Sequence, residues 1–283
     1  MGPNRKPSSR ARRLRRLDLK KTLFVLPNAI TLASIFCGFN AILIVSTESP
    51  SGSDFYKAAM LLIFAMFFDL LDGRVARMTK TQSAFGLQID SLADIVSFGV
   101  APSVLVYKWS LNHFPTAGVL AAFLFTACGA IRLARFNVLS SDPSGTPVKP
   151  GKYVTGLPIP PASGVLITLV VANHAAGGAL GGAEYALLIM GVTVGLSLLM
   201  VSNIQFRSFK DLSLTPATVM FVLFIIGSSA VVWQRYEPPF VLVWLLSIYI
   251  AIGILEWLRS LPGRVREARL GASERTEPEG PAD

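Results

Sequence analysis

Four aspartates in one short stretch are the residues of this sequence best suited to chemistry. Asp69 and Asp72 are three residues apart, and Asp90 and Asp94 are four apart. At about 100° per residue, each pair would share one face of an α-helix. Two helices that bring these carboxylates to a common cleft would form an oxygen-only site, which Mg²⁺ and Mn²⁺ prefer. Crowded carboxylates could not all stay ionised at low dielectric without such cations. The spacing therefore predicts a divalent-metal site.

Two other interpretations of these carboxylates remain open at this point. Acidic residues near helix ends often face water and do nothing further. A cation transporter would also use intramembrane carboxylates, but it would be expected to carry them near mid-membrane with access from both sides. Ionisable residues between apolar segments are costly and usually mark function, and the pairing at one edge favours a metal site.

The composition places the site in a membrane protein. The chain has 283 residues, of which 52% are hydrophobic and only 15% charged, which is too apolar for a soluble globular domain. Apolar runs of bilayer-spanning length recur along it. We predict an all-α polytopic membrane protein with about eight transmembrane helices, at roughly residues 26–47, 56–76, 84–107, 115–137, 160–178, 184–203, 215–233 and 239–258.

The termini differ from this membrane domain. Residues 1–21 hold nine Lys and Arg against Asp18 alone. We expect residues 1–25 to form a basic tail with an amphipathic interfacial helix, near residues 14–26, before Pro27 opens the first span. Such a tail suits anionic lipid, and no base-reading motif suggests nucleic acid. Residues 26–260 would form the transmembrane domain and 261–283 a disordered cytoplasmic tail.

The connections between spans alternate in charge. The loop near residues 48–54 is acidic and that near 174–184 lacks Lys and Arg, whereas residues 74–80 and 132–152 are basic. Eight spans with both termini in the cytoplasm satisfy the positive-inside rule. The four carboxylates would then lie at the cytoplasmic ends of the second and third spans.

Polar residues elsewhere could join this site. Asn28 and Thr31 lie one turn apart in the first span, where a helix cap or a helix–helix hydrogen bond is an equally good explanation. Arg132 and Arg135, with Asn137, end the fourth span. They are either interface anchors or guanidinium groups that bind an anion beside the metal site.

The aspartates also belong to a longer pattern. Residues 69–94 match D-x-x-D-G-x-x-A-R-x8-G-x-x-x-D-x-x-x-D at every fixed position. The chain thereby resembles the CDP-alcohol phosphatidyltransferases. Within that family, the segments at residues 26–39, 134–137, 156–160 and 201–210 are similar to those of the bacterial and archaeal phosphatidylserine synthases, so the resemblance covers about residues 22–258.

The resemblance implies an activity and a set of roles. The activity is transfer of a phosphatidyl group from CDP-diacylglycerol to L-serine, with release of CMP, in the cytoplasmic membrane of a prokaryote. Two divalent cations, Mg²⁺ or Mn²⁺, would be the cofactors, and a homodimer is expected. A sister enzyme with glycerol 3-phosphate, inositol phosphate or an amino alcohol as acceptor is the alternative. The implied metal ligands are Asp69, Asp72, Asp90 and Asp94, and Asp94 would also be the general base. Gly73 and Ala76 would line the cytidine site. Arg77 would contact phosphate, and Gly86 would allow tight packing beside the site.

Overall fold

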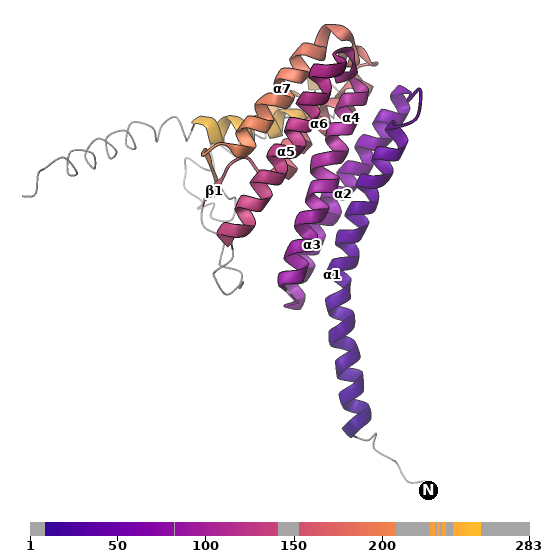
Figure 1. Ribbon diagram of the computed structural model, residues 1–283, viewed down its shortest axis with the longest axis vertical. Helices are drawn as coiled ribbons and strands as arrows, with labels where there is room; N and C mark the ends of the chain where they lie inside the picture. The colour runs from indigo at the N-terminus through magenta and orange to yellow at the C-terminus, as the bar shows by residue number, and fades with distance from the viewer. Residues whose placement is uncertain are drawn as a thin grey trace, which may run out of the picture.

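The protein is a bundle of long helices packed side by side (Figure 1). The computed structural model describes residues 9–81, 83–140, 153–207, 227–229, 231–232, 234–235 and 240–255, with side chains from Val25 onward. The principal helices of this part are α1 (Ser9–Val45), α2 (Gly52–Thr79), α3 (Ala84–Asp94), α4 (Ala101–Trp109), α5 (Pro115–Ser140), α6 (Ile159–Ala175) and α7 (Ala183–Val201). A further apolar helix spans Phe240–Leu255.

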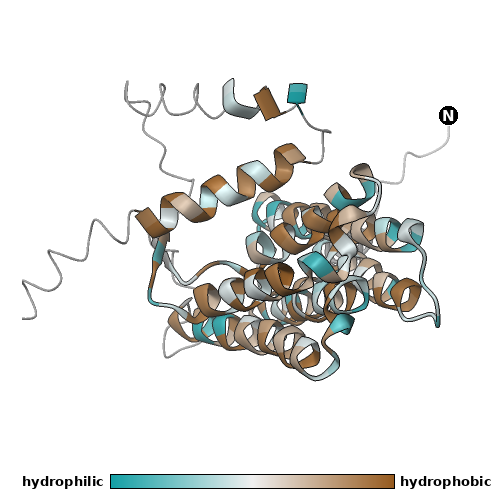
Figure 2. Cartoon of the chain, turned by 90° about the horizontal axis from the view of Figure 1, so that it is seen from above, coloured by the Kyte–Doolittle hydropathy of each residue, from teal (hydrophilic) through white to brown (hydrophobic). Residues whose placement is uncertain are grey.

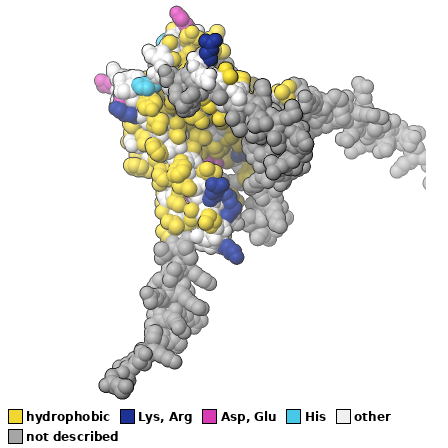
Figure 3. Space-filling model, turned by 180° about the vertical axis from the view of Figure 1, so that it is seen from behind, with side chains coloured by type: hydrophobic (Ala, Val, Ile, Leu, Met, Phe, Trp, Pro, Cys, Tyr) yellow, Lys and Arg dark blue, Asp and Glu magenta, His cyan; other side chains and the backbone are white. Residues whose placement is uncertain are grey.

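Four helical stretches are long and apolar enough to cross a membrane: Val25–Val45, Ala84–Trp109, Pro115–Leu139 and Ala183–Val201. The helices Ile159–Ala175 and Phe240–Leu255 are apolar but shorter. Large apolar side chains such as Phe36, Phe64 and Phe123 are exposed on the outside of the bundle. Hydrophobic residues cover much of the face seen in Figure 3, and much of the helical chain is hydrophobic (Figure 2). A face of this kind suits lipid rather than water, so the predicted class of helical membrane protein is confirmed.

The span boundaries agree with the predicted ones for most of the chain. Predicted spans 56–76, 115–137, 160–178 and 184–203 correspond to α2, α5, α6 and α7. Helix α2 is not among the four membrane-length stretches, and it carries charged residues towards its C-terminal end. The predicted span 215–233 lies mostly outside the described residues, as do the tails 1–8 and 256–283.

The first helix differs from the prediction. Pro27 was expected to open the first span after a separate interfacial helix, but it lies inside α1, which is continuous from Ser9 to Val45. Proline removes one backbone donor from a helix interior, yet the helix passes through it without a break. The N-terminal part of α1 extends away from the bundle (Figure 1).

Helices α1 and α2 pack closely because small residues meet at their interface. Ala41 of α1 and Ala58, Ala59 and Ala65 of α2 are all buried. Small side chains let membrane helices approach closely enough for extensive dispersion contact. This helix pair is the frame on which the first half of the site is built.

Helix α2 has a well-defined start and end. Ser51 and Asp54 form a capping box, in which the Ser51 hydroxyl accepts from the Asp54 backbone N–H and Asp54 accepts from the Ser51 N–H at 3.1 Å. Hydrogen bonds from Ser51 lower the pKa of Asp54 to about 2. The helix ends at Lys80, which adopts a left-handed conformation with φ 53°, a common way to stop a helix.

The third predicted span is one helical rod with a π-helical segment inside it. Asp94 ends α3, the π-helix η1 covers Ile95–Val100, and α4 follows directly. The Ala101 N–H bonds the Val96 carbonyl, five residues back. Pro102 cannot donate to the ladder, and in the same turn the Ser103 hydroxyl donates to the Gly99 carbonyl at 2.7 Å. Such π segments are frequent beside functional residues.

A short antiparallel sheet modifies the expected all-α class. Strand β1 (Tyr153–Thr155) pairs with β2 (Gln205–Arg207), with Val154 opposite Phe206. Gly156 continues the link, because its N–H bonds the Ile204 carbonyl at 2.8 Å. The sheet joins the start of α6 to the end of α7.

Candidate metal and substrate site

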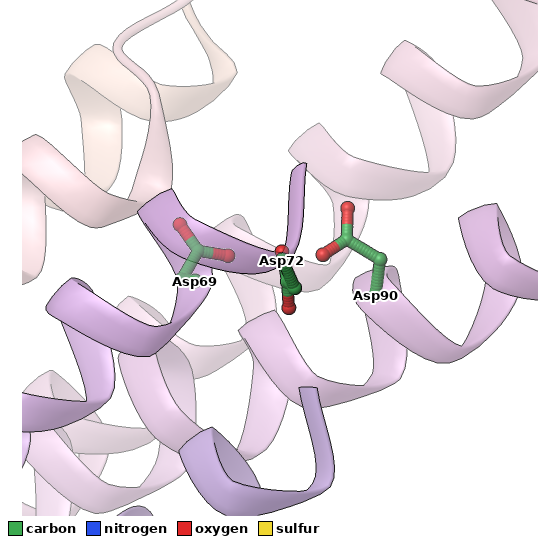
Figure 4. A group of neighbouring side chains, drawn as sticks. All are labelled: Asp69, Asp72 and Asp90. Carbon is green, nitrogen blue, oxygen red and sulfur yellow. The ribbon is translucent and has the colours of Figure 1, made fainter. Parts of the chain in front are cut away.

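Three carboxylates converge where α2 meets α3. Asp69 and Asp72 come from α2 and Asp90 from α3. One oxygen of each lies within 4.8 Å of the others, and Figure 4 shows the three side chains gathered at one place. The helical spacing predicted that four carboxylates from two helices would meet, and three of the four lie together in one cluster.

Among the described residues, no Lys or Arg forms an ion pair with these three carboxylates. Within the described part of the chain the one ion pair is Lys57–Asp54 at 3.2 Å, near the opposite end of α2. Asp72 is only 4% exposed, and its Oδ2 accepts from the Thr31 hydroxyl at 2.6 Å. Buried carboxylates without counter-charge are strongly disfavoured, so this donor set of oxygens suits divalent cations.

Asp94 stands one turn beyond Asp90 and outside the close trio. It is near enough to interact electrostatically with Asp69, Asp90 and Arg132. Its Oδ1 atom is buried and has no hydrogen-bond partner among the described residues. A buried acceptor without a donor is uncommon, and this oxygen is available to bind a cation or to take a proton, while the Asp94 side chain also contacts that of Asp69 through a hydrogen bond.

A cleft of about 220 Å³ opens beside Asp72 and Asp90. All six residues predicted here from the first three spans line it: Asn28, Thr31, Gly73, Ala76, Arg77 and Gly86. The lining also includes four residues that the sequence pattern did not indicate: Pro27, Thr81, Ser83 and Leu87. Thr81 and Ser83 fall in the unspecified stretch of the pattern, where only their hydroxyl groups hinted at a polar role.

The glycines of this cleft have different surroundings. A methyl group added at Gly86 would lie 3.2 Å from Ser83 Oγ and 3.8 Å from Asn28 Oδ1. Ser83 also caps α3 by accepting from the Gly86 N–H at 2.9 Å. A methyl group at Gly73 would meet the Arg77 guanidinium at 3.5 Å. Gly86 thus allows tight packing at the start of α3, and Gly73 leaves Arg77 room over the cleft.

The polar residues of α5 lie apart from this cleft, on the side of Asp94. Arg132 is 8% exposed, with its guanidinium 5.2 Å from the centre of the Phe136 ring. Arg135 is exposed and donates to Asn203 Oδ1 at 3.0 Å. Asn137 donates to the Ser91 hydroxyl of α3 at 2.8 Å. Arg132, Arg135 and Asn137, which were expected to act together, therefore have different surroundings. Of the three, only Arg132 is buried near an aspartate of the pattern, Asp94.

Hydrogen bonds between helices hold the first three spans in register next to the carboxylate cluster. Ser34 of α1 donates to the Ala65 carbonyl of α2 at 3.2 Å, and Ser97 of η1 donates to the Ser34 carbonyl at 3.1 Å. A methyl group added at Gly38 would lie 2.9 Å from Ser97 Cα. The close contact and the hydroxyl bonds fix the π segment, and with it the end of α3 at Asp94.

A carboxylate cluster beside a polar cleft, inside an apolar helical bundle, suits a membrane enzyme that binds a divalent cation. The profile of the CDP-alcohol phosphatidyltransferase family matches residues 24–202, which contain the cluster and the cleft. The chain belongs to this family.

Individual relatives extend the match over most of the chain. The CDP-diacylglycerol–serine O-phosphatidyltransferase of Helicobacter pylori strain J99 is 36% identical over 236 residues, 83% of this chain and 92% of the relative. The protein of that name from Mycobacterium bovis is 33% identical over 277 residues, 92% of this chain and 91% of the relative. The archaetidylserine synthase of Methanothermobacter thermautotrophicus is 34% identical over 192 residues, 67% of this chain and 72% of the relative.

Proposed function

We propose that the protein transfers the phosphatidyl group of CDP-diacylglycerol to L-serine, giving phosphatidylserine and CMP. The observation that carries this proposal is the carboxylate cluster of α2 and α3 beside a polar cleft in an apolar bundle. A lipid substrate with a charged head group needs such an arrangement, because its tails stay in the bilayer while its phosphates reach a polar site. The relatives described above are named for serine or a serine lipid.

Asp69, Asp72 and Asp90 would hold two divalent cations, Mg²⁺ or Mn²⁺, with Asp94 as a further ligand. Bound cations would neutralise the diphosphate and make CMP a better leaving group. Thr31 supports this role because its hydrogen bond to Asp72 holds one carboxylate oxygen in place. A carboxylate oriented in this way binds metal better than a freely rotating one.

The remaining roles belong to side chains around the cleft. Gly73 and Ala76 leave space for the cytidine, and Arg77 lies where it can donate to phosphate. The serine hydroxyl oxygen forms a bond to the phosphorus that carries the diacylglycerol, and the bond from that phosphorus to the CMP oxygen breaks. Asp94 would accept the proton that the hydroxyl loses, as the general base.

The proposal includes a membrane arrangement and an assembly. Eight transmembrane helices would place both termini and the cluster on the cytoplasmic side of a prokaryotic membrane. The basic N-terminal residues would lie on anionic lipid at that surface. A homodimer is proposed by family resemblance.

CMP release from CDP-diacylglycerol by the purified protein in detergent tests the function. We expect release to require both L-serine and Mn²⁺ or Mg²⁺, and phosphatidylserine to form in equal amount. Asp72→Asn should abolish release, whereas Asn112→Ala, an exposed change in the short helix Leu111–His113, should leave it intact. Equal release with glycerol 3-phosphate in place of serine would assign the protein to a sister activity.

A further inference from the structure

Three buried polar side-chain atoms of α3 and α5 have no hydrogen-bond partner among the described residues. They are Asp94 Oδ1, Arg132 Nε and Asn137 Oδ1. Buried polar atoms are almost always hydrogen-bonded, so a group of three around one junction indicates a place for a ligand. The atoms differ in kind: the arginine nitrogen can only donate, and the amide oxygen can only accept.

Ser91 determines which way the Asn137 amide points. The Ser91 hydroxyl donates its one proton to the Leu87 carbonyl at 3.1 Å. Its oxygen must therefore accept the second bond, which comes from Asn137 Nδ2 at 2.8 Å. The NH₂ group of Asn137 is committed to Ser91, and its carbonyl oxygen is left as a buried acceptor.

The two α5 residues flank the same face of α3. Ser91 and Asp94 are three residues apart on α3 and so share a face. Asn137 bonds Ser91, and Arg132 lies within electrostatic range of Asp94. A donor from Arg132 thus lies near the residue assigned to take the proton, and an acceptor from Asn137 lies one turn away along α3, beside Ser91.

We propose that Asn137 Oδ1 accepts a hydrogen bond from the ammonium of an amino-acid substrate whose carboxylate is bound by Arg132, and that Ser91 is a positioning residue for Asn137. This inference rests on the proposed function and assigns its acceptor specificity. L-Serine carries both groups beside its hydroxyl. Glycerol 3-phosphate and inositol phosphate have no ammonium, and their anionic oxygens would be repelled by the amide oxygen. A site built to bond an N–H group discriminates strongly against acceptors that lack it.

Two inhibitors that cannot react test the inference without relying on turnover of an altered substrate. L-Alanine has the ammonium and the carboxylate but no hydroxyl, and propionate has the carboxylate alone. In the parent protein L-alanine should compete with serine at a concentration about ten-fold or more below that of propionate. Asn137→Ala should weaken inhibition by L-alanine by that factor and leave inhibition by propionate unchanged. The KM for CDP-diacylglycerol should stay at the parent value.

Ser91 provides a second and milder variant. Ser91→Ala should reduce the preference for L-alanine over propionate as inhibitor, because the Asn137 amide loses the hydrogen bond that orients it. Ser91→Thr should restore the preference because it restores the hydroxyl. Asn112→Ala serves as the matched control. An unchanged preference in both Asn137→Ala and Ser91→Ala, with serine-dependent CMP release intact, would overturn this inference alone. A parent protein that uses another alcohol and not serine would overturn the proposed function and the inference with it.

Discussion

A buried carboxylate is stable only when something balances its charge or removes it. Around Asp72 the described residues supply one hydroxyl, from Thr31, and no paired Lys or Arg. Arg77 is close enough to interact electrostatically with Asp72 but forms no ion pair with it. The arrangement is poorly suited to stability by itself. It makes sense as a site kept open for cations, which is why the cluster argues for function.

The role of Asp94 can be tested separately from the roles of its neighbours. Asp94 lies outside the trio of Asp69, Asp72 and Asp90, and one of its oxygens has no hydrogen-bond partner in the part of the chain that the structure describes. Asparagine keeps the shape and still offers an oxygen, but it cannot accept the serine proton. We expect Asp94→Asn to lower kcat by about 10²–10⁴-fold, the usual contribution of a general base.

Steady-state CMP release at increasing Mn²⁺ measures this effect. Excess Mn²⁺ should leave the loss in Asp94→Asn unrepaired, while CDP-diacylglycerol still binds. Asp90→Asn is the comparison, because a lost ligand should be recovered in part by more cation. Full recovery of Asp94→Asn by Mn²⁺ would leave Asp94 as a ligand only.

Sequence reasoning succeeded for residues whose relation is local. Asp69 and Asp72 share a face because a helix repeats every 3.6 residues, and no distant contact is needed to see it. The bond of Arg135 to Asn203 joins residues 68 apart, and that of Asn137 to Ser91 joins residues 46 apart. No periodicity in the sequence indicates such pairs, so the division of the α5 residues emerged only from the structure.

Among the elements, the connections were harder to predict than the helices. Apolar length identified the stretch 84–107, but nothing in it announced that Ile95–Val100 would be π-helical. The pairing of β1 with β2 likewise joins two three-residue strands across α6 and α7. Elements this short carry too little pattern to be recognised, and their pairing depends on how the helices pack.

Gly156 is the residue on which this small sheet depends. Its φ is 78°, and an added methyl group would collide with the Met200 carbonyl oxygen. A left-handed conformation costs a non-glycine residue about 1–2 kcal/mol, before any displacement of the Met200 backbone. We therefore expect Gly156→Ala to lower the thermal unfolding midpoint in detergent and to reduce CMP release, because the segment after α7 that holds Asn203 would move.

Gly195→Ala, in the middle of α7, is a matched control for that change. A methyl group there would meet nothing within 4 Å, and alanine favours a helix over glycine by about 1 kcal/mol. Its unfolding midpoint should equal or exceed that of the parent. If Gly156→Ala unfolded at the parent temperature, the sheet would not be the constraint that its geometry suggests.

For the whole molecule, the distribution of charge predicts orientation in the membrane. The helices of the bundle can be assigned from apolar length, and the loops between them alternate between basic and acidic or neutral. The positive-inside rule would then place the end of α2, with Asp69, Asp72 and Arg77, on the cytoplasmic side. The start of α2, with the capping box of Ser51 and Asp54, would face the opposite side.

Single-cysteine labelling tests this orientation. The two native cysteines, Cys37 and Cys128, are both buried, so replacing them with serine gives a background without reactive thiols. Glu48→Cys, in the exposed loop before α2, should react with a membrane-impermeant maleimide in intact cells. Met78→Cys, at a position 83% exposed near the end of α2, should react only after the membrane is opened. The reverse pattern would place the carboxylates outside, where cytoplasmic CDP-diacylglycerol could not reach them, and both the topology and the proposed function would have to be abandoned.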